Sequence, residues 1–159
     1  MACRTYSVVT LHLKEHVPWT RTLRELDEVG DVVFKDEFSH RIVAEIDLRK
    51  IASVAERLND ISKSVVYEVK IVCKKKTGLP KEGKWRIISK TPRLAAYGIV
   101  NGRYVFAERT KKAIVYKIGK PSRASTPPSL LPASAFQFTE KELLGVIEEV
   151  DRLVEALSR

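Results

Sequence analysis

Lysine and arginine are concentrated in one stretch of the chain, residues 73–135. The 159-residue chain has a net charge of +9. Residues 73–135 hold 15 Lys and Arg against two carboxylates, a net +13, whereas residues 1–72 carry −1 and residues 136–159 carry −3. A single-sign block of this size raises the local concentration of anions and speeds their capture. The stretch therefore predicts a surface for a polyanion, and RNA or DNA is the expected partner.

Aromatic residues alternate with the cations of this stretch, as in Trp85-Arg86 and Arg103-Tyr104. Proteins that bind single strands combine a positive groove with rings on which bases stack. Trp85 is the best candidate for an exposed ring, and we expect most of the others to be core: Tyr97, Tyr104, Phe106 and Tyr116. The expected nucleic-acid contacts are Lys74, Lys75, Lys76, Lys81, Lys84, Trp85, Arg86, Arg103, Arg109, Lys111, Lys112, Lys117, Lys120 and Arg123. Contacts to phosphates carry no base information, so weak sequence specificity is expected.

Two short motifs have the spacing of catalytic sites, but their surroundings argue against both. Residues 78–84, GLPKEGK, have the spacing of a phosphate-binding loop. Trp85 stands where a Ser or Thr would hold magnesium, and a strand-like segment follows where a helix N-terminus would hold phosphate. His12, Glu15 and His16 form an H-x-x-E-H string, which is a zinc motif on a helix, whereas His12 is in a predicted strand. We therefore expect no enzyme, no metal site and no cofactor.

Hydrophobic periodicity in the first half predicts a ferredoxin-like (split βαβ) arrangement over residues 1–74. Strands are predicted at Thr5–Leu13, Asp31–Lys35, Ser39–Asp47 and Ser64–Lys74, and helices at Trp19–Val29 and Leu48–Ser62. Asp47 is a good N-cap for the second helix. The order strand, helix, strand, strand, helix, strand is that of the split βαβ unit.

The two cysteines of the chain, Cys3 and Cys73, lie just before the first of these strands and near the end of the last. The first and last strands of a split βαβ unit lie side by side and antiparallel, so these two ends should meet. We expect Cys3 and Cys73 to form a close pair or a disulfide, which requires Cα atoms within about 7 Å.

The second half predicts a β-meander over residues 84–118. Strands are predicted at Trp85–Ser89, Leu94–Val100, Arg103–Glu108 and Lys112–Ile118. Asn101-Gly102 between two of them is a strong signal for a type I′ hairpin turn. The expected register pairs Val100 with Arg103, Ile99 with Tyr104, and Tyr97 with Phe106.

A Pro/Ser-rich linker over residues 119–138 and a helix over 139–158 are expected to follow a single α+β domain at 1–118. The segment Thr139-Glu140-Lys141-Glu142 is a capping box at the start of this amphipathic helix. Its apolar stripe has coiled-coil spacing and comprises Leu143, Val146, Val150, Leu153 and Leu157. The stripe must be buried, either on the sheet or against a partner.

Two other function classes fit parts of the chain. In the first, the protein is an adaptor or subunit of a larger complex that docks through the C-terminal stripe and the basic strip, or self-associates through the stripe. In the second, least favoured, it is an enzyme for small anionic substrates, which would need His12, His40 or Glu108 beside the basic strip.

Composition bears on the source and location. The chain has three side-chain amides and one Met among many Lys, Arg and Glu residues, which is typical of heat-adapted proteins and suggests a thermophilic, archaeal source. No apolar run approaches the roughly 20 residues of a membrane helix. The N-terminus lacks the features of a secretion signal, so a cytoplasmic location is expected.

Overall fold

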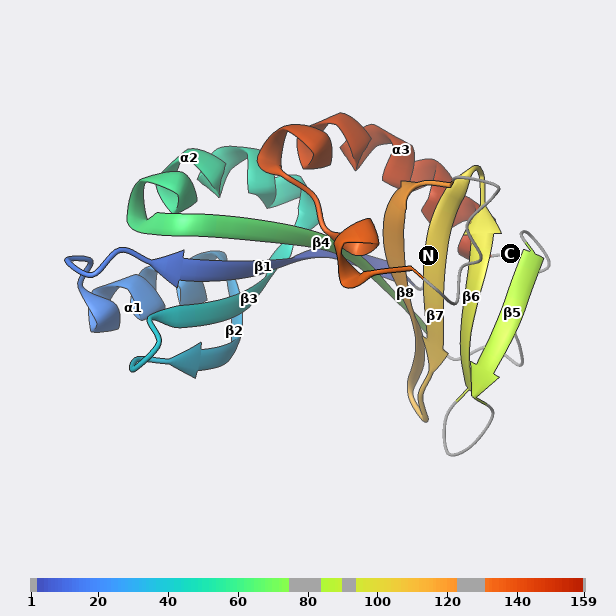
Figure 1. The fold of residues 1–159 in the computed structure, drawn as a ribbon, viewed down its shortest axis with the longest axis horizontal. Coiled ribbons are helices and arrows are strands. Elements are labelled where there is room, and N and C mark those ends of the chain that lie inside the picture. Colours follow the sequence, from blue (N-terminus) through green and yellow to red (C-terminus); the bar gives the residue numbers. More distant parts are fainter. Residues whose placement is uncertain (1–2, 75–83, 90–93, 123–130, 159) are drawn as a thin grey trace. The chain divides into compact units, whose positions relative to one another are not determined.

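The computed structural model describes residues 3–74, 84–89, 94–122 and 131–158, and the side chains of residues 84, 89, 94 and 158 lie outside the described part. The fold is α+β, with three helices and one antiparallel sheet of eight strands in the order β2-β3-β1-β4-β8-β7-β6-β5 (Figure 1). Contacts divide the chain into two compact units. Unit 1 comprises residues 1–5, 69–137 and 146–159, and unit 2 comprises residues 6–68 and 138–145.

Unit 2 contains two helices and most of the first four strands, whose residues 3–5 and 69–74 belong to unit 1. Its elements are β1 (Cys3–Leu13), α1 (Trp19–Val29), β2 (Gly30–Asp36), β3 (Arg41–Asp47), α2 (Ile51–Ile61) and β4 (Ser62–Lys74), with a 3-10 turn η1 (Leu48–Lys50) before α2. The Asp47 side chain accepts a hydrogen bond from the Arg49 backbone N–H and so caps η1, whereas the N-cap position of α2 itself is Lys50, whose side chain makes no capping hydrogen bond. The hydrophobic periodicity of the sequence predicted the bounds of these elements to within a few residues, because a buried face repeats regularly along a strand or helix. Examples of buried residues are Val9, Leu11, Ile42, Ala44, Ile51, Ala55 and Leu58.

Strand β2 lies at the edge of the sheet and is irregular. Its pairing with β3 shifts between Val32 and Phe34, which marks a β-bulge and leaves Val33 without an opposite residue. Beyond the bulge, Lys35 lies opposite Ile42, which is fully buried on the covered face of the sheet. Lys35 itself is exposed, so the edge strand carries a solvent-accessible charge next to the buried row.

Besides the end of β4, unit 1 contains the other four strands. These are β5 (Lys84–Ser89), β6 (Leu94–Val100), β7 (Arg103–Arg109) and β8 (Ala113–Pro121). The β6–β7 register is the predicted one, with Val100 opposite Arg103 and Tyr97 opposite Phe106, and Asn101 and Gly102 have the positive φ angles of a type I′ turn. Strand β8 pairs with β4, so the meander does not stand apart but continues the first four strands as one sheet. The sheet is thus more extended than the sequence predicted.

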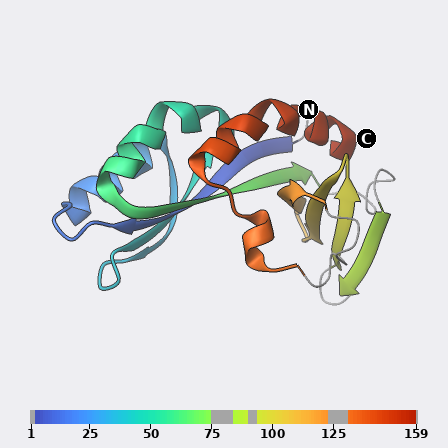
Figure 2. The ribbon, with the colours of Figure 1, turned by 45° about the horizontal axis from the view of Figure 1, so that its top comes forward.

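The C-terminal segment supplies two helical elements, the 3-10 helix η3 (Ala133–Phe136) and α3 (Glu140–Ser158). The predicted capping box is confirmed: the Thr139 hydroxyl accepts from the Glu142 N–H, and the Glu142 carboxylate accepts from the Thr139 N–H. Figure 2 shows η3 and the second half of α3 on opposite sides of the strands of unit 1. Phe138 forms an isolated bridge with Tyr67, and β8 continues to Pro121, inside the expected linker at 119–138.

The apolar stripe of α3 is core. Leu143, Val146, Val150, Leu153 and Leu157 are each at most 7% exposed. A stripe that the chain itself covers cannot dock a partner while the protein is folded, so an adaptor would need another surface. The two compact units do not coincide with the expected boundaries at residues 118 and 138, and the division into a domain, a linker and a helix stays a prediction.

Among the described residues, no helix combines the length and the apolar character that crossing a membrane requires.

Candidate nucleic-acid interface

The strand register of unit 1 places one row of cations and rings across five strands. Residues directly opposite each other in antiparallel strands share a face of the sheet. Arg86 lies opposite Tyr97, Tyr97 opposite Phe106, Phe106 opposite Lys117, and Lys117 opposite Lys70. We call these five residues the cation–aromatic row. It joins residues that are up to 47 positions apart in the sequence, and two rings lie at its centre.

The two rings of the row are in contact and partly accessible. The ring centroids of Tyr97 and Phe106 are 4.9 Å apart, with the ring planes inclined at 52°. Phe136 of η3 is 7% exposed, and its ring lies 6.1 Å from that of Tyr97. Tyr97 and Phe106 remain half-buried, whereas Tyr104 and Tyr116 on the same strands are 3% and 0% exposed. The expectation that most rings would be core therefore holds for the latter pair and not for the former.

The row lies on the face of the sheet opposite to α3. Residues on the other face, Ala96, Val105, Ile114 and Ile118, are fully or nearly fully buried. Arg103, on that buried face, is hydrogen-bonded to Glu149 of α3, which fixes the side on which α3 lies. The sheet of unit 1 thus has one face covered by the helix and a second face that carries the row.

Three exposed lysines meet at one end of these strands. Lys74, the last residue of β4, lies opposite Ala113, the first residue of β8. Lys111 and Lys112 precede Ala113 in a turn that Thr110 closes with hydrogen bonds to Ala113. We call Lys74, Lys111 and Lys112 the basic corner. Pairing of β4 with β8 therefore brings together cations that are nearly 40 residues apart in the sequence.

Carboxylates are nearly absent from the described part of this region. Over residues 69–74, 84–89 and 94–122, ten Lys and Arg residues accompany a single carboxylate, that of Glu108. Glu108 is half-buried and lies opposite Val115 and Ala95, in the row of residues next to the cation–aromatic row. The local field is positive, because one carboxylate neutralises only a small part of this charge.

Arg103 is a structural residue in this fold. It is 8% exposed and donates two hydrogen bonds to the Glu149 carboxylate, at 2.8 and 2.9 Å, and one to the Gly119 carbonyl at 3.2 Å. The hydrogen bond from Arg103 holds the pKa of Glu149 below its ordinary value of 4.5. Since these groups occupy the guanidinium, we leave Arg103 out of the proposed contact surface.

Trp85 does not stand out into solvent from the row. It lies opposite Gly98, on the α3 side of the sheet, and it is half-buried. A methyl group added to Gly98 would come within 2.5 Å of Cε3 of the indole, so the ring lies over the glycine. We likewise leave Trp85 out of the contact surface, although the sequence favoured it as an exposed ring.

The other predicted contacts fall in several places. Lys75, Lys76, Lys81 and Arg123 lie outside the described residues. Lys84 is the first residue of β5, and its side chain is not described. Arg109 is half-buried at the end of β7, opposite Ile114 on the covered face.

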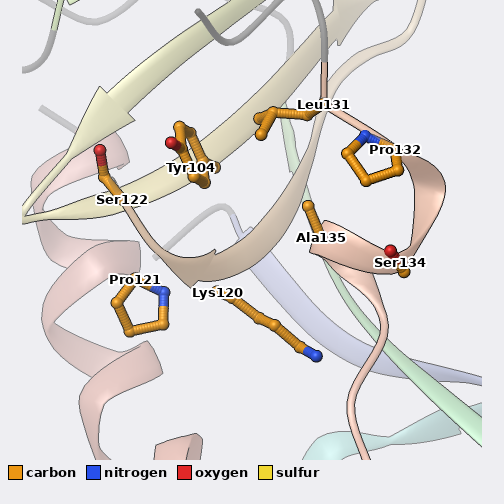
Figure 3. Close-up of a pocket in the computed structure, with 8 residues that line it drawn as sticks. All are labelled: Tyr104, Lys120, Pro121, Ser122, Leu131, Pro132, Ser134 and Ala135. Carbon is orange, nitrogen blue, oxygen red and sulfur yellow. The ribbon is translucent and has the colours of Figure 1, made fainter. Parts of the chain in front are cut away.

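Lys120 lines a pocket of about 590 Å³ beside the end of β8 (Figure 3). Its other described lining residues are Tyr104, Pro121, Ser122, Leu131, Pro132, Ser134 and Ala135. None of these lining residues is a carboxylate or a histidine. These described residues include no pair of groups for acid–base chemistry, and Lys120 is the one cation among them.

The structure describes the two motifs with catalytic spacing to different extents. His12 is exposed in β1 opposite Arg41, and within the described part of the chain no three His, Cys, Asp or Glu residues are grouped to hold a metal ion. Residues 78–83 of the phosphate-loop-like segment lie outside the described residues, and β5 rather than a helix follows them.

Cys3 and Cys73 lie side by side with Cα atoms 4.0 Å apart and form a disulfide, which is the closeness that the sequence predicted. The bond joins the start of β1 to the end of β4, one residue before Lys74. It fixes the strand end on which the basic corner is built.

Sequence reasoning missed Lys70, Tyr97 and Phe106 as members of the site. Two signals pointed to them. The Asn101-Gly102 turn already paired Tyr97 with Phe106, and the alternation of Val69, Ile71 and Cys73 placed Lys70 on the opposite face of its strand. The pairing of β4 with β8, which aligns Lys70 with Lys117, had no signal in the sequence.

No protein-family model matches the chain, and neither a curated protein nor a solved structure matches it.

Proposed function

We propose that the protein binds nucleic acid, without catalysis, through the face of unit 1 that carries the cation–aromatic row. The observation that carries this proposal is the register itself, which sets Arg86, Lys117 and Lys70 in line with the contacting rings of Tyr97 and Phe106. Cations on both sides of two partly accessible rings suit a polymer that has a charged backbone and aromatic bases.

The basic corner extends this surface along β4. Lys70 and Lys74 point to the same face, since they are four residues apart in one strand. Lys111 and Lys112 lie beside Lys74. A phosphate backbone that contacts the row would thus find further cations toward one end of the strands. Such contacts position a nucleic acid without reading its sequence.

The test is fluorescence-anisotropy binding to short RNA and DNA oligomers over a range of salt concentrations. Each phosphate contact made by a lysine contributes about one unit to the slope of log affinity against log salt. Replacing Lys74, Lys111 and Lys112 together with Glu should lower the affinity for all sequences alike and reduce that slope by about three units.

A matched control changes the same amount of charge elsewhere. Lys35, Arg49 and Lys50 are exposed residues of unit 2, and their joint replacement with Glu alters the net charge of the protein equally. This control should keep most of the affinity. An equal loss in both triple variants would mean that net charge alone drives binding, and no binding by the unaltered protein at low salt would refute the proposal.

We also propose that unit 2 belongs to the ferredoxin-like class. The support is the element order of its strands and helices and the position of β1 between β3 and β4, with every strand pair antiparallel. A solved relative with the same order of elements but a different strand order would count against this assignment.

We further infer a heat-adapted, archaeal and cytoplasmic protein. The support is the composition poor in amides and rich in Lys, Arg and Glu, together with the Cys3–Cys73 disulfide. Disulfides inside cells are usual in hyperthermophiles and rare elsewhere. A melting temperature above about 90 °C is the expected result, and one in the ordinary mesophilic range would refute the inference.

A further inference from the structure

We infer that the ligand of this face is a single strand, with neighbouring bases stacked on Tyr97 and Phe106. This inference rests on the proposed function and names its substrate class. Bases in a duplex have their flat faces covered by their neighbours, so a ring of the protein can stack only on an unpaired base. Exposed rings in a binding face thus select single strands.

Exposure singles out these two rings. Five aromatic residues lie on β5, β6, β7 and β8, and three of them are half-buried. Of these three, Trp85 lies on the α3 side over Gly98. Tyr97 and Phe106 are on the opposite face, where the ring of Phe136 in η3 lies 6.1 Å from that of Tyr97. Tyr104 on that face is buried, so Tyr97 and Phe106 are the partly accessible rings of these strands on the face with the row.

The spacing of the rings also suits a single strand. Their centroids are 4.9 Å apart, close to the distance between neighbouring strands. Bases in a duplex follow one another at about 3.4 Å. Two bases on these rings would be spread beyond duplex spacing and inclined to each other, as the 52° between the rings requires. An unpaired strand can take this conformation, whereas a duplex cannot.

The flanking cations indicate how such a strand would lie. From Arg86 on β5 to Lys70 on β4 the row crosses four strand spacings, about 19 Å. The rings occupy the two inner strands β6 and β7, with Arg86 on one side and Lys117 and Lys70 on the other. Phosphates on either side of the stacked bases would therefore each meet a cation, and Glu108 in the next row would repel a strand that strayed from this path.

The experiment compares single and double strands of the same sequence and the same sugar, RNA and DNA in turn, by anisotropy at fixed salt. The unaltered protein should bind the single strand at least about 10-fold more tightly, since one stacked base is worth this much. Tyr97→Leu and Phe106→Leu keep apolar bulk but remove the rings, and each should weaken single-strand binding about 5- to 150-fold. The salt slope should not change, because neither ring carries charge.

Two controls separate stacking from folding. Tyr97→Phe keeps the ring and should keep the affinity, and Phe34→Leu removes an exposed ring of unit 2 and should have no effect. If a leucine variant fails to fold, the unaltered protein is titrated with a single strand containing the fluorescent base 2-aminopurine. Stacking on a ring should change its fluorescence, and no change on saturation would overturn the inference.

The outcomes distinguish the two proposals. In one outcome, binding depends on salt, duplex and single strand bind with equal affinity, and both leucine variants keep that affinity. This outcome overturns the stacking inference and leaves the proposed function standing. Absence of binding to every oligomer at low salt overturns both. Single-strand preference that is lost with the rings supports both.

Discussion

The indole of Trp85 lies over Gly98 of the neighbouring strand, so closely that a methyl group on Gly98 would be 2.5 Å from Cε3 of the ring. The two residues are directly opposite each other in β5 and β6. Aromatic rings that cover a strand glycine fill the space that its missing side chain leaves. Trp85 thus protects the sheet of unit 1 near its edge, and Gly98 is the residue that admits it.

Gly98→Ala should therefore destabilise the protein. The added methyl group would displace the ring, and overpacking of this kind costs about 1–3 kcal/mol of unfolding free energy, measured by chemical denaturation. Gly145→Ala is the matched control, because Gly145 is exposed in α3 with nothing within 4 Å of the added atom. That change should stabilise the protein by about 0.5–1 kcal/mol. Equal stability of Gly98→Ala and the unaltered protein would contradict this position of Trp85.

Glu149→Gln should lower the unfolding free energy at neutral pH by about 1–2 kcal/mol, a value reduced for the partial exposure of the carboxylate. Arg103 lowers the pKa of Glu149 below 4.5 in the folded state, so the ion pair stabilises the protein above that pH. Its contribution is lost as pH falls through the lowered pKa. The difference between the two proteins should therefore close in acid. The exposed neighbour Glu148 supplies the control, and Glu148→Gln should show no such pH dependence.

Reduction of the Cys3–Cys73 disulfide should lower the unfolding free energy by about 4 kcal/mol, because the bond closes a loop of 70 residues. The measurement is a denaturation curve with and without a thiol reductant. A variant with Cys3→Ser and Cys73→Ser should match the reduced protein and should not respond to the reductant. A reductant effect of the same size in that variant would assign the change to another cause.

Tyr67 should stay protonated well beyond the ordinary pH for a phenol. Burial, with a smaller contribution from the charge of Glu140, raises its pKa from 10 to about 12. A raised pKa means that the stability it contributes is complete below pH 10 and is lost as pH rises toward 12. Tyrosinate absorbance of the folded protein, compared with that of Tyr67→Phe, should show the ionisation of Tyr67 only near pH 12. Ionisation at pH 10 would show that the side chain is hydrated.

The local elements of this fold could be predicted from the sequence. Period-two alternation of apolar residues predicted β1, β3 and β4. The Asn101-Gly102 turn predicted the β6–β7 register residue by residue. The capping box at Thr139 and Glu142 marked the start of α3. These features depend on residues that are near in the chain, where turn geometry and side-chain spacing decide the result.

The assembled surface could not be predicted, because it depends on a long-range strand pairing. Consecutive strands usually pair, which would favour β5 beside β4. Instead β8 lies beside β4, and this choice places Lys117 opposite Lys70 and Ala113, the residue after Lys112, opposite Lys74. Burial of Arg103 followed from α3 packing on the same sheet, which again no local signal revealed. Charge composition located the basic region correctly but could not assign its individual cations to a face.

The bulge in β2 and the exposed charge of Lys35 have a consequence for the behaviour of the protein in a crowded solution. A strand at the rim of a sheet offers unpaired backbone groups to any similar strand that approaches, which is the first step of fibril growth. Here the approaching strand would face a hydrogen-bond ladder that the bulge interrupts, and its pairing would require desolvation of the Lys35 ammonium group. Apolar side chains such as Val33 and Phe34 can thus remain in water at this rim without seeding aggregates.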